Sequence, residues 1–204
     1  MSIDWATFGS TIIAAVIGGC IAGYFAMRST DKAFENQKKQ AQQNEDKLIK
    51  GVMQAIHDET ETVFERYQET MGAKLESLPE GQPLLVYYPL VSDFFTVYNS
   101  NAFLLGRIPD NDLRKQIIKT YTLGKGIIDS FRMNNDMLQK FDYWNQVFQE
   151  SKNATHQQKA AALFHSLVLY AKDMKTTHQQ VKSEISQLLR TLRKQGVLSE
   201  NKKP

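Results

Sequence analysis

A heptad repeat near the C-terminal end of the chain constrains the fold most strongly. Apolar side chains recur there at alternating steps of four and three residues over more than four heptads, which is typical of a long helix packed against other helices. The repeat consists of Ala160, Phe164, Leu167, Ala171, Met174, His178, Val181, Ile185, Leu188 and Leu192. We expect this helix to open at Thr155, with Gln158 completing a capping box, and to end at Gly196. Such a face requires long antiparallel neighbours, so the sequence predicts a helical bundle.

The preceding sequence supplies those neighbours. A second long helix is predicted over 110–150, where Pro109 and the acidic residues after it provide the start. An apolar stripe at helical spacing runs from Leu48 to Met71, and a shorter helix begins after a cap at Ser92 or Asp93. The predicted fold class is therefore all-α. The seam of the 110–150 helix consists of Leu113, Ile117, Tyr121, Ile128, Phe131, Leu138, Phe141 and Phe148.

The N-terminal sequence carries a long apolar run. No charged side chain occurs from Trp5 to Met27, and this run exceeds the roughly 20 residues that a helix needs to cross a bilayer. Arg28 and several lysines follow the run, whereas none precedes it, so we expect a single-pass protein of the cell inner membrane with a cytoplasmic C-terminus. Two alternatives, a cleaved signal peptide and a lipidated Cys20, both need basic residues ahead of the run and are therefore less favoured.

These patterns divide the chain into four parts. They are a transmembrane anchor at 1–28, a polar helical stalk at 29–47, a helical bundle at 48–196 and a disordered tail at 197–204. A second span over 84–106 has a suitable length, but Pro89 and Asp93 interrupt it, and a charge inside the membrane is costly.

Small residues recur every four positions within the predicted anchor. This spacing allows two helices to approach closely in lipid, although glycine and alanine are also common in membrane helices for other reasons. We therefore expect a homo-oligomer that forms through this segment. The association residues are Ala15, Gly19 and Gly23 on one face and Ala14, Gly18 and Ala22 on the next.

The sequence carries few signs of catalysis. The four histidines form no metal-binding motif, and Gly124-Lys125-Gly126 lacks the upstream glycine of a phosphate-binding loop. Glu61, Glu65 and Glu69 line one helix face, which is usual for a solvated surface. The single cysteine leaves no intramolecular disulfide. We predict that the protein is not an enzyme and uses no cofactor, metal or small-molecule substrate.

Two features of the last helix allow a functional interpretation. His178 is the polar member of the heptad face, where it is either a buried pH switch or a histidine that is partly solvated or bonded to a neighbour. Five basic residues form a possible partner surface, although no exposed aromatic residues alternate with them and a solvated helix end is therefore the default interpretation. They are Lys175, Lys182, Arg190, Arg193 and Lys194.

The segment from Phe95 to Pro109 carries a family resemblance, through Tyr98, Asn101-Ala102 and Leu105-Gly106. It resembles a group of small bacterial inner-membrane proteins that have N-terminal spans and a cytoplasmic helical domain. Some members resemble membrane effectors of phage-defence systems, including those encoded beside retron reverse transcriptases. The resemblance implies an architecture and a setting, and it implies no catalytic residues.

Two functional hypotheses follow from the sequence. In the first, the protein is an antiphage effector that perturbs the membrane in abortive infection and is controlled by a cytoplasmic protein or ribonucleoprotein. In the second, it is a non-toxic, membrane-tethered helical scaffold that recruits a cytoplasmic partner.

Overall fold

The computed structural model describes residues 5–89 and 93–197, and it describes side chains from residue 23 onward. Within these ranges all regular structure is helical, which confirms the all-α prediction. The chain divides into two compact units, Met1–Leu48 and Ile49–Pro204. Helix α1, Trp5–Tyr67, begins in the first unit and continues into the second.

The described side chains of the first unit lie on α1, which is mostly polar from Arg28 onward. From Gly23 to Leu48 they are exposed, apart from a half-buried Glu45. Local contacts support the helix, such as the bond of 3.1 Å from the Gln42 amide to Asp46 one turn later. Because this stretch is one helix with mostly charged and amide side chains, it forms no apolar core of its own.

The predicted membrane anchor is corrected by the structure. Among the described residues, no helix combines the length and the apolar character that crossing a membrane requires. From Arg28 onward, α1 carries charged and amide side chains at most positions, which keeps its described part polar. The expectation of a transmembrane helix at 1–28, and of a single-pass inner-membrane location, is therefore wrong on this finding. Most of that predicted segment lies outside the residues whose side chains are described.

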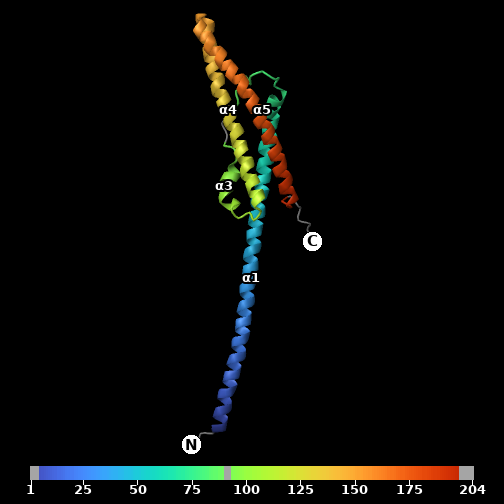
Figure 1. Cartoon of the computed structure of the whole chain (residues 1–204). Coiled ribbons are helices and arrows are strands. Elements are labelled where there is room, and N and C mark those ends of the chain that lie inside the picture. Colours follow the sequence, from blue (N-terminus) through green and yellow to red (C-terminus); the bar gives the residue numbers. More distant parts are fainter. Residues whose placement is uncertain (1–4, 90–92, 198–204) are drawn as a thin grey trace. The chain divides into compact units, whose positions relative to one another are not determined.

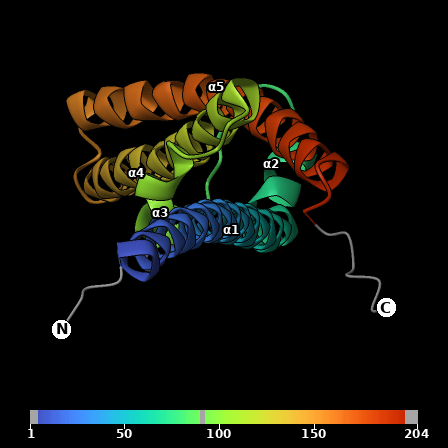
Figure 2. The same cartoon turned by 90° about the horizontal axis from the view of Figure 1, so that it is seen from below.

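The second unit is a helical bundle, drawn in Figures 1 and 2. α1 passes into a π-helix, η1 (Gln68–Gly72), and a short α2 (Ala73–Ser77). The next helix along the chain is α3 (Thr96–Leu105). Two helices of 41 residues each, α4 (Asn111–Ser151) and α5 (Ala154–Lys194), lie side by side as an antiparallel hairpin in both views.

Two apolar clusters fill the bundle. The first joins α1, α3, α4 and α5 and includes Ile56, Leu105, Ile117 and Leu188. The second joins η1, α2, α4 and α5 and includes Met71, Leu75, Phe131, Met174 and Val181. Nine of the ten predicted heptad residues of α5 are buried, and the exception is Phe164. The heptad therefore identifies the inner face of α5 correctly.

The predicted helix ends need small corrections. The predicted start of α4 after Pro109 is correct, and the structure shows that Asp110 is its cap, because its carboxylate accepts hydrogen bonds from the backbone amides of Asp112 and Leu113 at 2.9 and 3.0 Å. The cap of α5 is Asn153, whose side chain accepts from the amide of Thr155 at 2.8 Å, so the predicted capping box, with Thr155 as the cap, is wrong by two residues. Gly196 lies just beyond the last turn with a φ of 72°.

The start of α3 differs more from the prediction. Asp93, one of the two predicted caps, precedes the helix without capping it, and the other, Ser92, lies outside the described residues. Instead, Phe95 adopts a left-handed backbone with a φ of 66°, and the carboxylate of Glu59 on α1 accepts from the amides of Val97 and Tyr98 at 2.7 and 3.0 Å. Residues 84–89 are extended, so 84–106 is not a single helix.

Candidate functional site

The far end of the α4–α5 hairpin is the least covered part of the second unit. We call residues 143–166 the hairpin end, and residues 49–142 and 167–197 the body. Within the hairpin end only Ala160 is buried, although the heptad face of α5 continues through it. Both helices are 41 residues long, whereas the part of the chain that packs beside them from Ile49 to Ser77 is shorter. The hairpin therefore extends past its neighbours.

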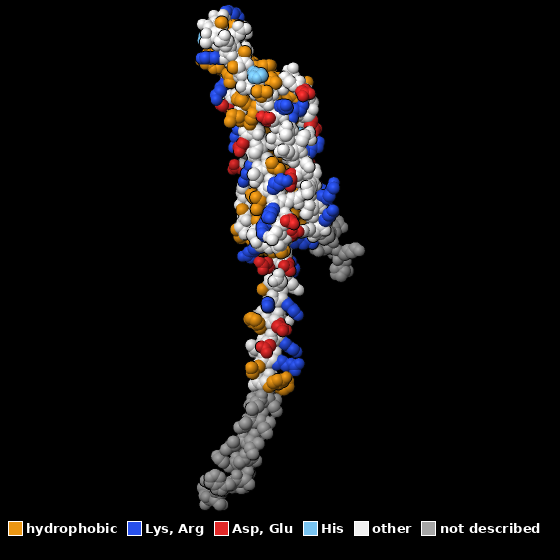
Figure 3. All heavy atoms as spheres, viewed as in Figure 1, with side chains coloured by type: hydrophobic (Ala, Val, Ile, Leu, Met, Phe, Trp, Pro, Cys, Tyr) orange, Lys and Arg blue, Asp and Glu red, His pale blue; other side chains and the backbone are white. Residues whose placement is uncertain are grey.

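Aromatic side chains dominate the hairpin end. Trp144 contacts Tyr143 and His156 at ring-centroid distances of 5.1 and 5.6 Å, and Phe164 contacts Phe141 on α4 at 5.6 Å. Tyr143 is 59% exposed and Phe164 is 38% exposed. Hydrophobic side chains gather over this region in the upper part of Figure 3. An apolar cluster of this kind, not covered by another element, is typical of a protein-binding surface.

The charges around this cluster are mixed. The Lys159 ammonium lies 3.9 Å from the Trp144 ring centroid, and Lys152 lies over the Phe148 ring at 5.8 Å. Glu150 accepts a hydrogen bond from Gln146 at 3.1 Å. The surface therefore offers large apolar contacts with charges of both signs at its border, which is the usual anatomy of a protein interface.

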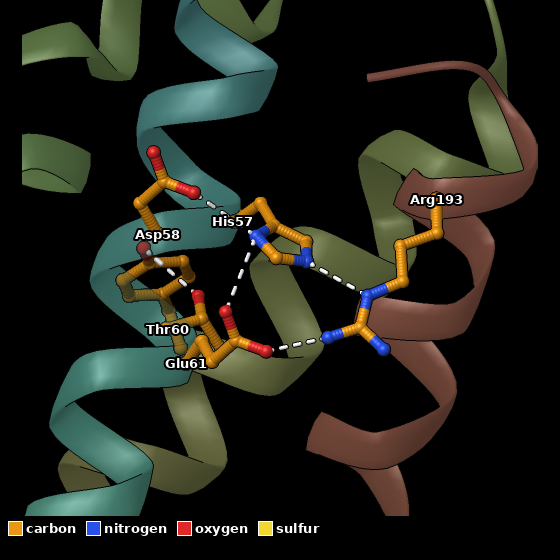
Figure 4. A network of polar contacts seen from close by, with 6 residues as sticks. His57, Asp58, Thr60, Glu61 and Arg193 are labelled. Carbon is orange, nitrogen blue, oxygen red and sulfur yellow. Dashed lines mark hydrogen bonds and ion pairs between the residues drawn. The ribbon is translucent and has the colours of Figure 1, made fainter. Parts of the chain in front are cut away.

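The body contains three polar networks, and Figure 4 shows the one around His57. The Nε of Arg193 lies 3.2 Å from the Nε2 of His57. Because an arginine Nε only donates, the His57 Nε2 accepts, and its Nδ1–H donates to Asp58 at 3.1 Å. Arg193 also pairs with Glu61. The network ties α5 to α1.

This network offers no arrangement for nucleophilic catalysis. His57 is 1% exposed, so little of its ring is open to solvent. The nearby hydroxyl of Thr60 points toward the hydroxyl of Tyr121 at 3.3 Å and not toward His57. A histidine base needs a nucleophile within hydrogen-bond reach, and none of the described neighbours provides one. The arrangement is that of a structural contact.

The second network surrounds His178, which is 1% exposed. Burial raises the pKa of Tyr67, so its hydroxyl stays protonated and donates to the His178 Nδ1 at 2.7 Å. The Nε2–H of His178 then donates to Glu76 at 3.0 Å. Hydrogen bonds, first from Lys182 and then from His178, hold the pKa of Glu76 at about 2. Of the two interpretations of His178, the structure supports a histidine bonded to its neighbours, and it is fully buried.

The third network is centred on Glu59 of α1. Besides capping α3, its carboxylate accepts a hydrogen bond of 2.8 Å from the hydroxyl of Tyr121 on α4. The Tyr98 ring of α3 stacks on the Tyr121 ring with a centroid distance of 3.9 Å. Burial raises the pKa of Tyr121, so this hydroxyl remains a donor. Glu59 thus joins α1, α3 and α4 at one point.

The predicted basic surface is largely occupied by contacts within the chain. Lys175 donates to the carbonyl of Leu78, Lys182 pairs with Glu76 at 2.7 Å, and Arg193 pairs with Glu61. Arg190 and Lys194 are exposed and make no ion pair with another described residue. Of the five residues in the predicted basic surface, only these two remain without a polar side-chain contact to another described residue, so the predicted surface does not form a continuous basic patch.

The predicted association face falls mostly outside the described side chains. Gly23 is described, is exposed and has open space around its Cα. The other predicted association residues have side chains outside the described part of the chain, and they are Ala14, Ala15, Gly18, Gly19 and Ala22.

Among the described residues there is no group of three or more histidine, cysteine or acidic side chains placed to hold a metal ion.

Sequence reasoning missed the hairpin end and the Glu59 contacts. A usable signal for the hairpin end was present, because two helices predicted at about 40 residues must extend past a shorter third one. No local signal marks Glu59, since its partners lie 38 and more residues away.

No protein-family model, curated protein or solved structure matches this chain.

Proposed function

We propose that this protein is a non-enzymatic helical scaffold that acts by binding proteins, and that it self-associates through the hairpin end. The observation that supports this proposal is the continuation of an apolar heptad face past the elements that cover it elsewhere. Phe164 on this face and Trp144 on the neighbouring α4 are half-exposed aromatic side chains, a kind that is enriched at protein interfaces.

A second copy of the chain suits this surface. Two hairpin ends packed about a two-fold axis form a four-helix arrangement, in which the seam of each hairpin covers the seam of the other. The mixed charges of Glu150, Lys152 and Lys159 carry little net charge, so identical surfaces do not repel each other strongly.

No described residue bears on the defence role that the family resemblance implies, and that role stays a sequence-based prediction.

The oligomeric state of the full chain tests this proposal. We expect sedimentation velocity to show a dimer or larger assembly for the wild type, and a smaller species for the double variant Tyr143→Lys with Phe164→Lys. The matched control is Phe103→Lys, because Phe103 is 73% exposed on α3 and does not belong to the hairpin end. Circular dichroism verifies that each variant keeps its helices. A wild type that sediments as a monomer, or a double variant that behaves like the control, contradicts the proposal.

A further inference from the structure

The body contains an apolar cavity of about 120 Å³. It lies among α1, α4 and α5, beside Phe94 and Phe95, and its lining includes Val63, Ile128 and Val181. An engineered apolar cavity of roughly 150 Å³ stays dry and binds a benzene-sized molecule. The space in this protein is therefore of the right order for a single ring or a short alkyl chain.

The wall of the cavity is fixed by a close contact. A Cβ placed on Gly124 of α4 would lie 2.8 Å from the Phe95 ring, so only glycine lets this ring lie against α4. The ring also packs edge-on against Tyr121 at a centroid distance of 5.0 Å. The left-handed backbone of Phe95 is unusual for a bulky residue, and such strain persists where the surroundings hold it. The space is thus bounded by side chains that cannot easily collapse into it.

Three hydroxyl groups in the lining are bonded to protein atoms. Tyr121 donates to Glu59, Thr60 contacts Tyr121, and Tyr67 donates to His178. A water molecule inside a cavity needs two to four polar partners. Because these hydroxyls are engaged with protein atoms, the cavity favours an apolar occupant over water.

The cavity reaches the surface beside α1. Thr62 and Arg66 belong to its lining and are both exposed. The Arg66 guanidinium makes no hydrogen bond or ion pair with a described residue. An apolar space with an available guanidinium at its opening matches a molecule that is apolar at one end and anionic at the other.

We propose that this cavity binds a small amphipathic anion, with one aromatic ring or a short alkyl chain inside and a carboxylate at Arg66. The site lies in the body, and its residues are separate from the hairpin end. The inference therefore stands or falls independently of self-association.

The test uses the full chain with benzoate as the probe and benzyl alcohol as the uncharged probe of similar size. Binding is measured by calorimetry at matched ionic strength. We expect benzoate to bind more tightly than benzyl alcohol to the wild type. Arg66→Gln should weaken benzoate binding by about tenfold, which corresponds to one charged hydrogen bond, and leave benzyl alcohol unaffected. The matched control is Arg132→Gln, an exposed arginine on α4, which should bind like the wild type.

A cavity-filling variant, Ile128→Phe, should abolish the binding of both probes. If this variant does not fold, nuclear Overhauser contacts between the benzoate ring and Val181 or Phe131 of the wild type locate the probe directly. The proposal is overturned if the wild type binds neither probe, if it binds both equally, or if Arg66→Gln behaves like Arg132→Gln. Benzoate contacts at other residues would also overturn it.

Discussion

The body and the hairpin end are made from the same two helices, yet they differ in how their apolar faces are covered. In the body, Leu188 and Leu192 of α5 have no exposed surface, because α1 and α3 also pack on this cluster. In the hairpin end, Phe164 continues the same heptad with 38% of its surface exposed. The comparison shows that a heptad identifies which face of a helix is apolar, whereas burial depends on whether a third element reaches that face.

The largest expected effect is a difference in the free energy of unfolding between variants of the body and variants of the hairpin end. Leu188→Ala should lower the free energy of unfolding by about 2–5 kcal/mol, because it leaves a cavity in a closed core. Phe164→Ala should cost about 1 kcal/mol, since its ring is already partly solvated. Both are measured by urea unfolding in a Tyr143→Lys background, which keeps self-association from contributing. Equal losses at the two positions would show that the hairpin end is as well covered as the body.

The loss of a polar contact in the body should also lower the free energy of unfolding. Glu59→Ala removes the acceptor for the amides of Val97 and Tyr98 and for the hydroxyl of Tyr121. We expect a loss of about 1–3 kcal/mol in the free energy of unfolding, because these donors become unpaired. Glu65→Ala, an exposed change on the same helix, is the control and should alter stability by less than about 0.5 kcal/mol. Similar losses for the two variants would remove Glu59 from the contacts that hold the body together.

The Glu76 contacts should make the stability of the body depend on pH. The pKa of Glu76 is about 2 in the folded state and 4.5 as an ordinary value, so its contribution is present above pH 4.5 and is lost as the pH falls toward 2. The difference in urea midpoint between the wild type and Glu76→Gln should therefore shrink over this range. Glu80→Gln, in an exposed position of the following loop, is the control. A constant difference from pH 6 to pH 3 would contradict the assignment.

The smallest expected effect is at Gln179, which is exposed and lies off the heptad face beside the buried His178. Gln179→Ala should change the free energy of unfolding by less than about 0.5 kcal/mol. A larger change would mean that the solvent-facing side of α5 is covered by a further contact.

Periodicity predicted the helical fold well. The helix predicted over 110–150 is observed at Asn111–Ser151, and the α5 face is correct at every heptad position of the body. These results depend on local sequence alone, because the spacing of apolar residues reports the helix face directly. The predicted start of α4 just after Pro109 is correct for the same reason.

The features that sequence reasoning missed depend on contacts between distant residues. The cap of α3 comes from Glu59, and the partners of His178 come from Tyr67 and Glu76. The turn at Phe95 depends on Gly124, nearly thirty positions later. Local patterns carry no information about such pairs. The membrane prediction failed differently, because it rested on residues 1–28 and the described residues provide no membrane-crossing helix.

The π-helix between α1 and α2 has a consequence for insertions and deletions. A π-helical turn holds one residue more than the α-helical turn it replaces, so η1 sets the rotational position of everything that follows it in α2. Removing one residue, such as Thr70, would restore regular α-helical bonding but turn α2 by about 100° about its axis. Leu75 would then leave the core and Glu76 would leave His178. The length of this segment is thus as tightly constrained as the identity of its side chains.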